Sequence, residues 1–352
     1  MSDSDPGAPA PIEVFASRMA SAAVLAYFVG LVLVVAGMEL GGERLWPMAV
    51  LLYLPQQILL LPLIVLVPTA LLAEVPGRIW ALMAGCVIVY LWHVPFYTGW
   101  RSRSDPQGMK VMTNNYAQNH GLPLKPWIDE ADPDIVAIED ARGRGGSFKH
   151  EFPQRYVDQE DQFIFISKTP IHSAALVPAP FWRGAAVAAV CDVTWNGRDV
   201  AVYAIHMPTP RGDFARLRGL GIVREILGRN SARSDGLSFQ QAMTARVQLA
   251  GDLADVIAAE KRPYVLMGDF NMPSNGYVHG VFANRFADCF AAAGRGFGFT
   301  FPGDARNPIA LFQPWLRLDC VFAGPGWRVD QCEVEPSRRS KHRAVMAVLT
   351  PA

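Results

Sequence analysis

The sequence lacks a net charge and a cysteine-based metal motif, and its C-terminal two thirds lack any internal repeat. Charged residues make up only 18% of the 352 residues, and the formal net charge is +0. No global excess of positive charge therefore favours a nucleic-acid partner. The five cysteines include no CxxC pair and no metal-ligand spacing. Cys320 and Cys332 flank a predicted hairpin, and the sequence leaves open whether they form a disulfide.

Apolar residues are abundant instead, at 51% of the chain. The N-terminal part holds three long apolar runs, Met19–Leu40, Trp46–Ala73 and Ile79–Tyr97. Because about 20 apolar residues cross the hydrocarbon core of a bilayer, each run predicts a transmembrane helix. A helical hairpin plus one span is the fallback. The first run also has the composition of a signal peptide, but no small-residue cleavage site with a polar mature start follows it.

Four prolines interrupt the second run, Pro47, Pro55, Pro62 and Pro68. A helix in water would rarely survive four of them, whereas neighbouring helices in a membrane can satisfy the freed carbonyls. We therefore predict a multi-pass protein of the plasma or inner membrane, with the side of the C-terminal domain left open. The predicted parts are a flexible tail (1–17), a three-helix transmembrane region (18–100), a linker (101–108) and a catalytic domain (109–352).

Short apolar runs alternate with longer amphipathic stretches in the C-terminal domain, which predicts an α/β or α+β fold with one core. The expected strands are 110–113, 135–138, 162–167, 185–194, 200–206, 264–267, 318–323 and 344–349. The expected helices are 213–227 and 242–260.

One expected strand, 264–267, runs directly into Gly268-Asp269-Phe270-Asn271. Alternation in extended backbone places Asp269 and Asn271 on one side and turns Phe270 to the other. A carboxylate beside an amide at the mouth of a strand can hold a water molecule and the oxygens of a phosphate. Taken alone, the stretch is also consistent with a strand end capped by polar turn residues.

Other strands also deliver polar side chains at their ends. These residues are Asn115, Glu139, Asp140, His206, Asp319 and His342. Each has an ordinary structural explanation by itself, such as a turn asparagine or a packed histidine. Together they provide carboxylates for a hard divalent cation and histidines for acid–base or electrostatic help. That combination suits metal-assisted attack of water on a phosphoester.

The order of these motifs resembles the endonuclease/exonuclease/phosphatase superfamily, which has a DNase I-like fold. The resemblance covers about residue 108 to the C-terminus, and Gly268-Asp269-Phe270-Asn271 is its most specific element. It implies a four-layer α/β/β/α sandwich with the site at one end of the two sheets.

The resemblance also implies a role for each catalytic residue. Asp269 and Asn271 would hold the attacking water and the phosphate, and His206 would contact the phosphate. Asp319 would orient His342, which stabilises or protonates the group at the phosphorus centre.

Two positions depart from the family's pattern. The metal-binding Glu of the family falls at Asp140, with Glu139 where a Gln is usual, so either carboxylate could join Asn115 at a Mg²⁺ or Mn²⁺ ion. Lys341 replaces an aspartate, and with Arg343 it is expected to bind substrate phosphate. The same lysine could instead weaken metal binding. Retained hydrolysis is favoured, because the Asp–His pair does not need the lost aspartate.

An insertion between His206 and the helix near Ala242 is rich in arginine. Its arginines are Arg211, Arg216, Arg218, Arg224, Arg229 and Arg233. A basic amphipathic helix beside a phosphoesterase site could face anionic lipid headgroups. Because Asp213 and Glu225 lie in the same stretch, a solvated helix face is the competing interpretation.

The sequence as a whole predicts a membrane-anchored, divalent-metal-dependent enzyme that hydrolyses a phosphodiester or phosphomonoester. A lipid or lipid-linked phosphoester is the leading substrate, because tethering to a bilayer raises its local concentration. A membrane-tethered nuclease is the first alternative, and the neutral charge balance weakens it. The second is a non-catalytic membrane protein whose degenerate site binds a phosphorylated ligand. The headgroup and the oligomeric state are left open.

Overall fold

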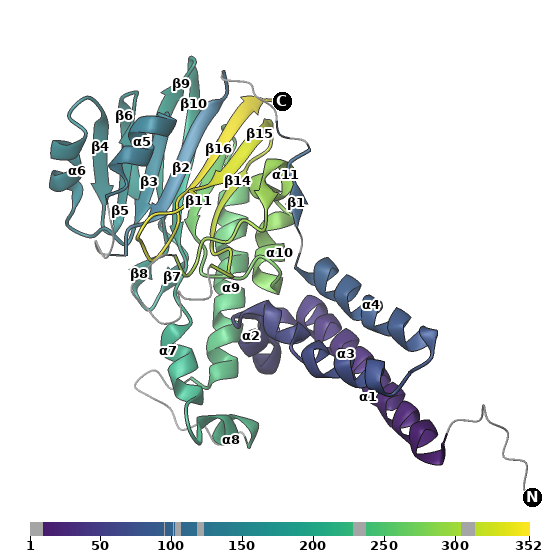
Figure 1. Cartoon of the computed structure of the whole chain (residues 1–352). Coiled ribbons are helices and arrows are strands. Elements are labelled where there is room, and N and C mark those ends of the chain that lie inside the picture. Colours follow the sequence, from purple (N-terminus) through teal and green to yellow (C-terminus); the bar gives the residue numbers. More distant parts are fainter. Residues whose placement is uncertain are drawn as a thin grey trace, which may run out of the picture.

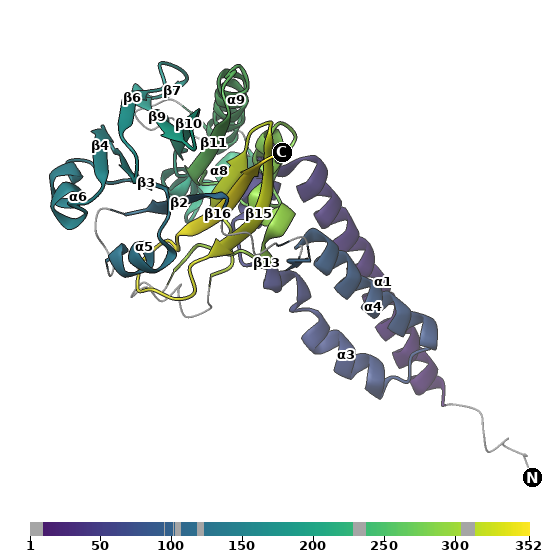
Figure 2. The same ribbon diagram turned by 90° about the horizontal axis from the view of Figure 1, so that it is seen from above.

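Two six-stranded sheets stack face to face, and a helical arm projects from one end of the stack (Figures 1 and 2). The computed structural model describes residues 10–94, 96–100, 102, 107–117, 123–227, 237–303 and 314–352. The predicted tail up to residue 9, most of the predicted linker, and Arg229 and Arg233 lie outside the described residues.

Both sheets are mixed, because β10 and β11 run parallel in one and β2 and β3 run parallel in the other, while the remaining pairs are antiparallel. The first sheet has the order β12 (Ala287–Asp288), β14 (Asp319–Ala323), β11 (Tyr264–Asp269), β10 (Arg198–His206), β9 (Ala188–Trp195), β6 (Ile171–Leu176). The second has the order β15 (Trp327–Val334), β16 (Val345–Pro351), β2 (Met109–Asn115), β3 (Ile135–Glu139), β5 (Phe163–Ser167), β4 (Tyr156–Glu160). Two short pairs lie outside them, β1 (Tyr97–Thr98) with β13 (Arg295–Gly296) and β7 (Phe181–Trp182) with β8 (Ala185–Ala186).

Apolar side chains that alternate along the strands fill the space between the sheets. Phe165 of one sheet and Val202 and Met267 of the other are fully buried there. The outer faces bury a second and a third apolar cluster under helices. These helices are α9 (Phe239–Ala258) and α10 (Tyr277–Ala283) on the first sheet, and α5 (Lys125–Ala131) and α6 (Gly145–Glu151) on the second. The predicted four-layer α/β/β/α sandwich is therefore confirmed.

Seven of the eight expected strands are present with shifted ends, and the expected strand 185–194 is divided between β8 and β9, which lie in different sheets. The expected helix 213–227 is wrong. That stretch breaks into α7 (Arg211–Phe214), a 3₁₀ turn η3 (Ala215–Leu217) and α8 (Gly221–Ile226). Gly219 has φ +58°, a left-handed conformation that ends a right-handed helix. Strands β4, β6 and β15 and helices α5, α6 and α10 were not expected from the sequence. Cys320 and Cys332 are buried free thiols.

The prediction of three transmembrane helices is also wrong. Among the described residues, α1 (Pro11–Leu40) is the one helix long and apolar enough to cross a membrane by itself. The second run forms α2 (Trp46–Leu52), η2 (Gln56–Leu60) and α3 (Leu63–Leu72), which bend by 100° at the break and would count as a span only together. The third run forms α4 (Gly77–His93), which is only 17 residues long. The prediction of a multi-pass membrane protein is therefore wrong as well.

The base of the arm packs on the sandwich, which hydropathy could not reveal. The buried carboxylate of Glu43, in η1 (Gly42–Arg44), accepts a hydrogen bond from the backbone N–H of Val278 at 3.2 Å. The N–H of Trp46 donates to Gln240 Oε1 at 2.9 Å. Residues 42–53 thus behave as part of the domain rather than as lipid-facing helix.

Candidate active site

The strand registers bring the predicted site residues to one edge of the two sheets. In the first sheet His206, Asp269 and Asp319 are register partners across β10, β11 and β14. In the second, Asn115 and Glu139 are partners at the ends of β2 and β3. Parallel strands end at the same edge, so five side chains that are far apart in sequence meet here.

Asp269 lies at the centre of this cluster and is 1% exposed. Its Oδ2 accepts hydrogen bonds from Asn115 Nδ2 at 2.8 Å and from Asn271 Nδ2 at 3.0 Å, and its Oδ1 accepts from the N–H of Asn271 at 2.8 Å. The Nε2 atoms of His342 and His206 lie 3.9 and 4.0 Å from the same Oδ2. Burial and the charge of Asp319 raise the pKa of Asp269, while the charges of His342 and His206 and the hydrogen bond from Asn115 oppose that rise.

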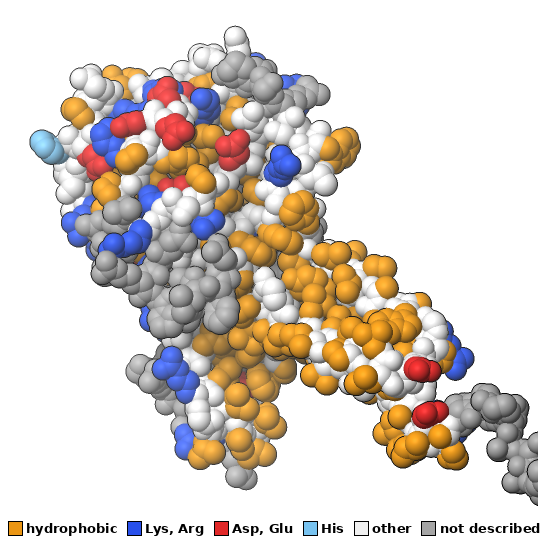
Figure 3. All heavy atoms as spheres, viewed as in Figure 1, with side chains coloured by type: hydrophobic (Ala, Val, Ile, Leu, Met, Phe, Trp, Pro, Cys, Tyr) orange, Lys and Arg blue, Asp and Glu red, His pale blue; other side chains and the backbone are white. Residues whose placement is uncertain are grey.

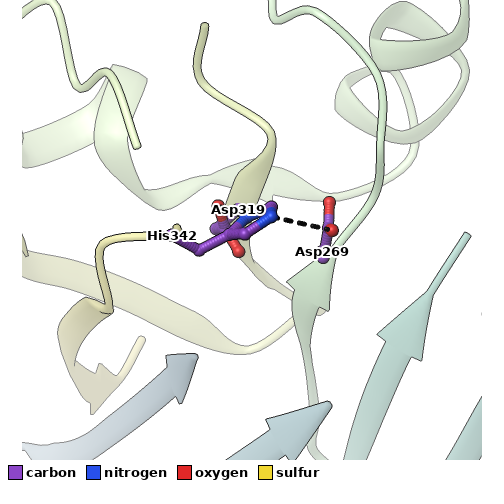
Figure 4. A group of neighbouring side chains, drawn as sticks. All are labelled: Asp269, Asp319 and His342. Atoms are coloured by element: carbon purple, nitrogen blue, oxygen red, sulfur yellow. Dashed lines mark hydrogen bonds and ion pairs between the residues drawn. The ribbon is translucent and has the colours of Figure 1, made fainter. Parts of the chain in front are cut away.

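Asp319 and His342 form the predicted pair. Asp319 Oδ2 and His342 Nδ1 are 2.9 Å apart, so the imidazole presents Nε2 toward Asp269 (Figure 4). Burial lowers the pKa of His342, but the carboxylates of Asp319 and Asp269 outweigh it and raise the pKa to about 9. The imidazole is therefore a cation at neutral pH, held between two carboxylates. Phe301 covers it, with ring centroids 4.9 Å apart.

Asn271 reaches Asp269 by a turn and not by strand alternation. Strand β11 ends at Asp269, and Asn271 has φ +47°. Phe270 points into the core, as alternation predicts, and is fully buried. Gly268 is required before them, because a Cβ there would lie 1.9 Å from the carbonyl oxygen of Ile205.

Two residues that sequence reasoning missed donate hydrogen bonds to the backbone carbonyl oxygen of Asn271. The Tyr53 hydroxyl donates to the carbonyl oxygen of Asn271 at 2.7 Å, and Arg246 Nη2 donates to the same oxygen at 2.9 Å. Tyr53 lies in a run that was expected to cross a membrane, so no sequence signal linked it to the site. Gln162, whose Oε1 lies 2.7 Å from His206 Nδ1, was missed in the same way.

The two adjacent carboxylates of β3 differ in environment. Glu139 is fully buried, and its Oε1 accepts a hydrogen bond from Thr113 Oγ1 at 2.7 Å. Its Oε2 has no hydrogen-bond partner among the described residues. Burial raises the pKa of Glu139 far above its ordinary value, and the charges of Asp319 and Asp269 add to the rise. Asp140 follows the end of the strand, with φ +52° and a partly exposed side chain.

The donor set fits a divalent cation. Glu139, Asp269 and Asp319 are three buried carboxylates, and Glu139 Oε2 and Asp319 Oδ1 are unpartnered among the described residues. The charges of Asp319 and Asp269 raise the pKa of Glu139, and the charge of Asp319 raises that of Asp269. Asp269 and Asp319, together with His342 when its imidazole is neutral, also offer ligand atoms within 4.8 Å of one another. Buried oxygens of this kind suit Mg²⁺ or Mn²⁺. Sequence reasoning treated those three residues as catalytic groups only.

The remaining predicted residues lie at the rim. Lys341 is partly exposed, and its charge lowers the pKa of His342. Arg343 is partly buried, and its N–H donates to the carbonyl oxygen of Thr300 at 3.0 Å. Neither has a described contact with Asp269. Arg317, two positions before Asp319, is buried, and its guanidinium pairs with Asp288 at 2.6 Å.

Comparisons with known proteins identify the domain. The sequence model of the Endonuclease/Exonuclease/phosphatase family matches residues 114–340. No curated protein matches the chain. Similar solved structures include the 3′ phosphatase NExo from Neisseria bound to product DNA hairpin, at 14% identity and TM-score 0.49, covering 69% of this chain and 99% of that one. A humanized D. rerio TDP2 matches at 12% identity and TM-score 0.48, covering 69% and 99%. A family member from Beutenbergia cavernae matches at 18% identity and TM-score 0.46, covering 70% and 72%.

Proposed function

The chain belongs to the Endonuclease/Exonuclease/phosphatase family, and we propose that it is a metal-dependent phosphoesterase, anchored by α1, that acts on a lipid or lipid-linked phosphoester. The observation that carries the proposal is the buried cluster around Asp269. There an ionisable base, a cationic histidine and an incompletely partnered Glu139 lie together at one sheet edge.

Each residue of the cluster has a defined task. Asp269 Oδ2, held by two amide donors, accepts the proton of the attacking water. His342 carries its positive charge toward the phosphoryl oxygens, where negative charge grows in the transition state. His206 contacts the phosphate, and Asn271, whose amide donates to Asp269 and to the carbonyl oxygen of Met207, holds Asp269 in place.

We assign the metal position to Glu139 with Asn115, in preference to Asp140. The burial of Glu139 and its unpartnered oxygen support that choice. Asn115 Oδ1 accepts from the N–H of Ala117 at 2.9 Å and keeps a second lone pair for a ligand. A divalent cation bound there would offset the charge of the phosphoester and lower the pKa of a bound water.

The structure of α1 favours an anchor over a cleaved signal sequence. The helix is 30 residues long and apolar enough to cross a membrane by itself, and most of its surface is exposed apolar side chain. Glu39 near its end pairs with His93 of α4 at 2.7 Å. His93 in turn lies 2.8 Å from Asn275, in the loop that follows the site. Loss of α1 would remove this link, so its retention is the simpler expectation.

The full chain in detergent micelles provides the direct test. It should hydrolyse a soluble aryl phosphodiester with Mg²⁺ or Mn²⁺, and Asp269→Ala or His342→Ala should lower the rate by at least about 10³-fold. Equal rates for wild type and both variants would contradict the enzyme and favour a non-catalytic phosphate-binding protein. Phospholipid, lipid-linked and DNA substrates, compared under the same conditions, then separate a lipid phosphoesterase from a membrane-tethered nuclease.

A further inference from the structure

A small helical lobe, residues 211–227, lies beside both the site and the base of the arm (Figures 1 and 2). Its Phe214 packs edge-on against Tyr53, with ring centroids 5.2 Å apart. Tyr53 is the residue whose hydroxyl holds Asn271. Phe214 also joins Trp46 of α2 in one apolar cluster. The lobe is therefore physically continuous with the catalytic loop on one side and with the arm on the other.

The outer face of the lobe is unusually apolar. Five large apolar side chains within eight positions are exposed, and they are Leu220 (70%), Ile222 (44%), Val223 (47%), Ile226 (65%) and Leu227 (57%). Hydrophobic side chains cover the lower lobe on the side that faces the arm, with basic side chains opposite (Figure 3). A contiguous exposed patch of this kind marks an interaction surface.

The acidic residues of the lobe are turned inward, which leaves its exposed charge positive. Buried Glu225 accepts hydrogen bonds from the N–H groups of Phe239 and Gln240, at the N-terminus of α9. Buried Asp213 pairs with Arg216 at 3.4 Å. The exposed charged residues of the lobe are Arg211, Arg218 and Arg224. The solvated face of mixed charge that the sequence allowed is thus not formed.

We infer that this lobe is a second membrane contact that rests on the surface of an anionic bilayer. Its apolar side chains enter the boundary between headgroups and acyl chains, and its arginines bind headgroup phosphates. The inference builds on the proposed anchor and narrows the substrate to a phosphoester at the bilayer surface. A nucleic acid would use the arginines but would leave the five apolar side chains in water.

A fluorescent label on the lobe tests the contact directly. Because the five native cysteines are buried, an environment-sensitive fluorophore attaches selectively to Ile226→Cys in the full chain. Arg198→Cys, at the opposite end of β10, is the control. In vesicles with anionic lipid, emission at 226 should shift to the blue and be quenched by a lipid-borne nitroxide, while emission at 198 should not. Water-like emission at 226, or a shift caused by DNA instead of vesicles, would overturn the inference.

A substitution pair then tests the consequence for catalysis. Ile222→Ser with Ile226→Ser should lower the hydrolysis rate of vesicle-borne phospholipid by about tenfold and leave the rate on a soluble aryl phosphodiester unchanged. Val256→Ser replaces an apolar residue of α9 outside the lobe that is about as exposed as Ile222, and it should change neither rate. An unchanged vesicle rate in the double variant overturns the lobe's role. If wild type fails on the soluble substrate, the proposed function fails, and the label still decides whether the lobe meets the bilayer.

Discussion

The two sheets contribute halves of the site that are prepared to different degrees. In the first sheet both oxygens of Asp269 accept amide hydrogen bonds, and Asp319 pairs with His342. In the second sheet Glu139 has one hydroxyl donor and one oxygen without a described partner. The half that we propose handles water and phosphate is thus more completely hydrogen-bonded by the protein itself, with Asp319 Oδ1 as its one oxygen without a described partner. The other half is complete only with a bound cation or a proton on Glu139.

Neutralising Glu139 and the adjacent Asp140 in turn should give the largest effect on metal dependence. Glu139→Gln should raise the Mg²⁺ or Mn²⁺ concentration needed for half-maximal activity by about 10–100-fold, because it removes the buried ligand charge. Asp140→Asn should change it by less than about threefold, since that side chain is partly exposed.

Metal binding to substrate-free protein gives a readout that does not depend on turnover. In a calorimetric titration with Mn²⁺, Glu139→Gln should weaken metal binding more than Asp140→Asn does. The reverse order, with Asp140→Asn the more damaging, would restore the position that the family resemblance implies. Without metal, Glu139→Gln should unfold at a higher temperature than wild type, because burial of that carboxylate opposes its charged form.

The second largest effect expected is a fall of the hydrolysis rate at alkaline pH, caused by loss of the proton from His342 in the first sheet's half of the site. The pKa of His342 is raised to about 9, so its charged form is favoured by the fold. The rate should be level through neutral pH and fall about tenfold per pH unit above about 9, as the imidazolium is lost. The stability gained from this charge is complete below the ordinary pKa of 6.5 and is lost as pH rises through about 9. A rate that still rises beyond pH 10 would contradict the cationic role.

Lys341 provides a control for the same titration. Its charge lowers the pKa of His342, so Lys341→Asp should move the alkaline midpoint of the pH–rate profile upward. Lys341→Gln should move it in the same direction by less. A midpoint that moves downward in both variants would show that the alkaline limit belongs to another group.

The smallest expected effect tests whether the arm helps to shape the first half. Tyr53→Phe removes one hydrogen bond to the carbonyl oxygen of Asn271 and keeps the ring that packs on Phe214. A loss of about 1 kcal/mol should lower kcat about fivefold with little change in KM. Tyr27→Phe, elsewhere in the arm, is the matched control and should leave both constants unchanged. An equal fall for both variants would point to general loosening of the arm.

The sequence allowed most of the sandwich and the candidate site to be predicted. Apolar runs mark the strands, and the polar residues at the ends of those runs mark the candidate site. The runs that end at Asn115, Glu139, His206 and Asp269 are short and apolar, and their terminal residues are polar. The register of each strand pair then follows from which face is buried. The choice between Glu139 and Asp140 was out of reach, because it depends on where β3 stops and turns into a left-handed residue.

The N-terminal third shows the limit of the same reasoning. Hydropathy measures how apolar a run is, and it cannot tell whether lipid or a protein surface covers that run. Ala49 is fully buried in one cluster with Phe239, and the two residues are 190 positions apart in the sequence. A contact of that sequence separation leaves no local pattern, so the docking of α2 and the role of Tyr53 emerged only from the structure.

The hydrogen bond from Tyr53 to Asn271 means that the sandwich domain depends on residues that precede it in the chain. A fragment begun at residue 109 would lack this hydroxyl and the buried carboxylate of Glu43, and it would uncover apolar side chains such as Phe214. The backbone turn beside Asp269 would then keep only one of its two side-chain hydrogen bonds, the one from Arg246. An expression boundary for work on this domain therefore has to lie before Gly41, so that Glu43 and Tyr53 and their contacts with the sandwich are kept.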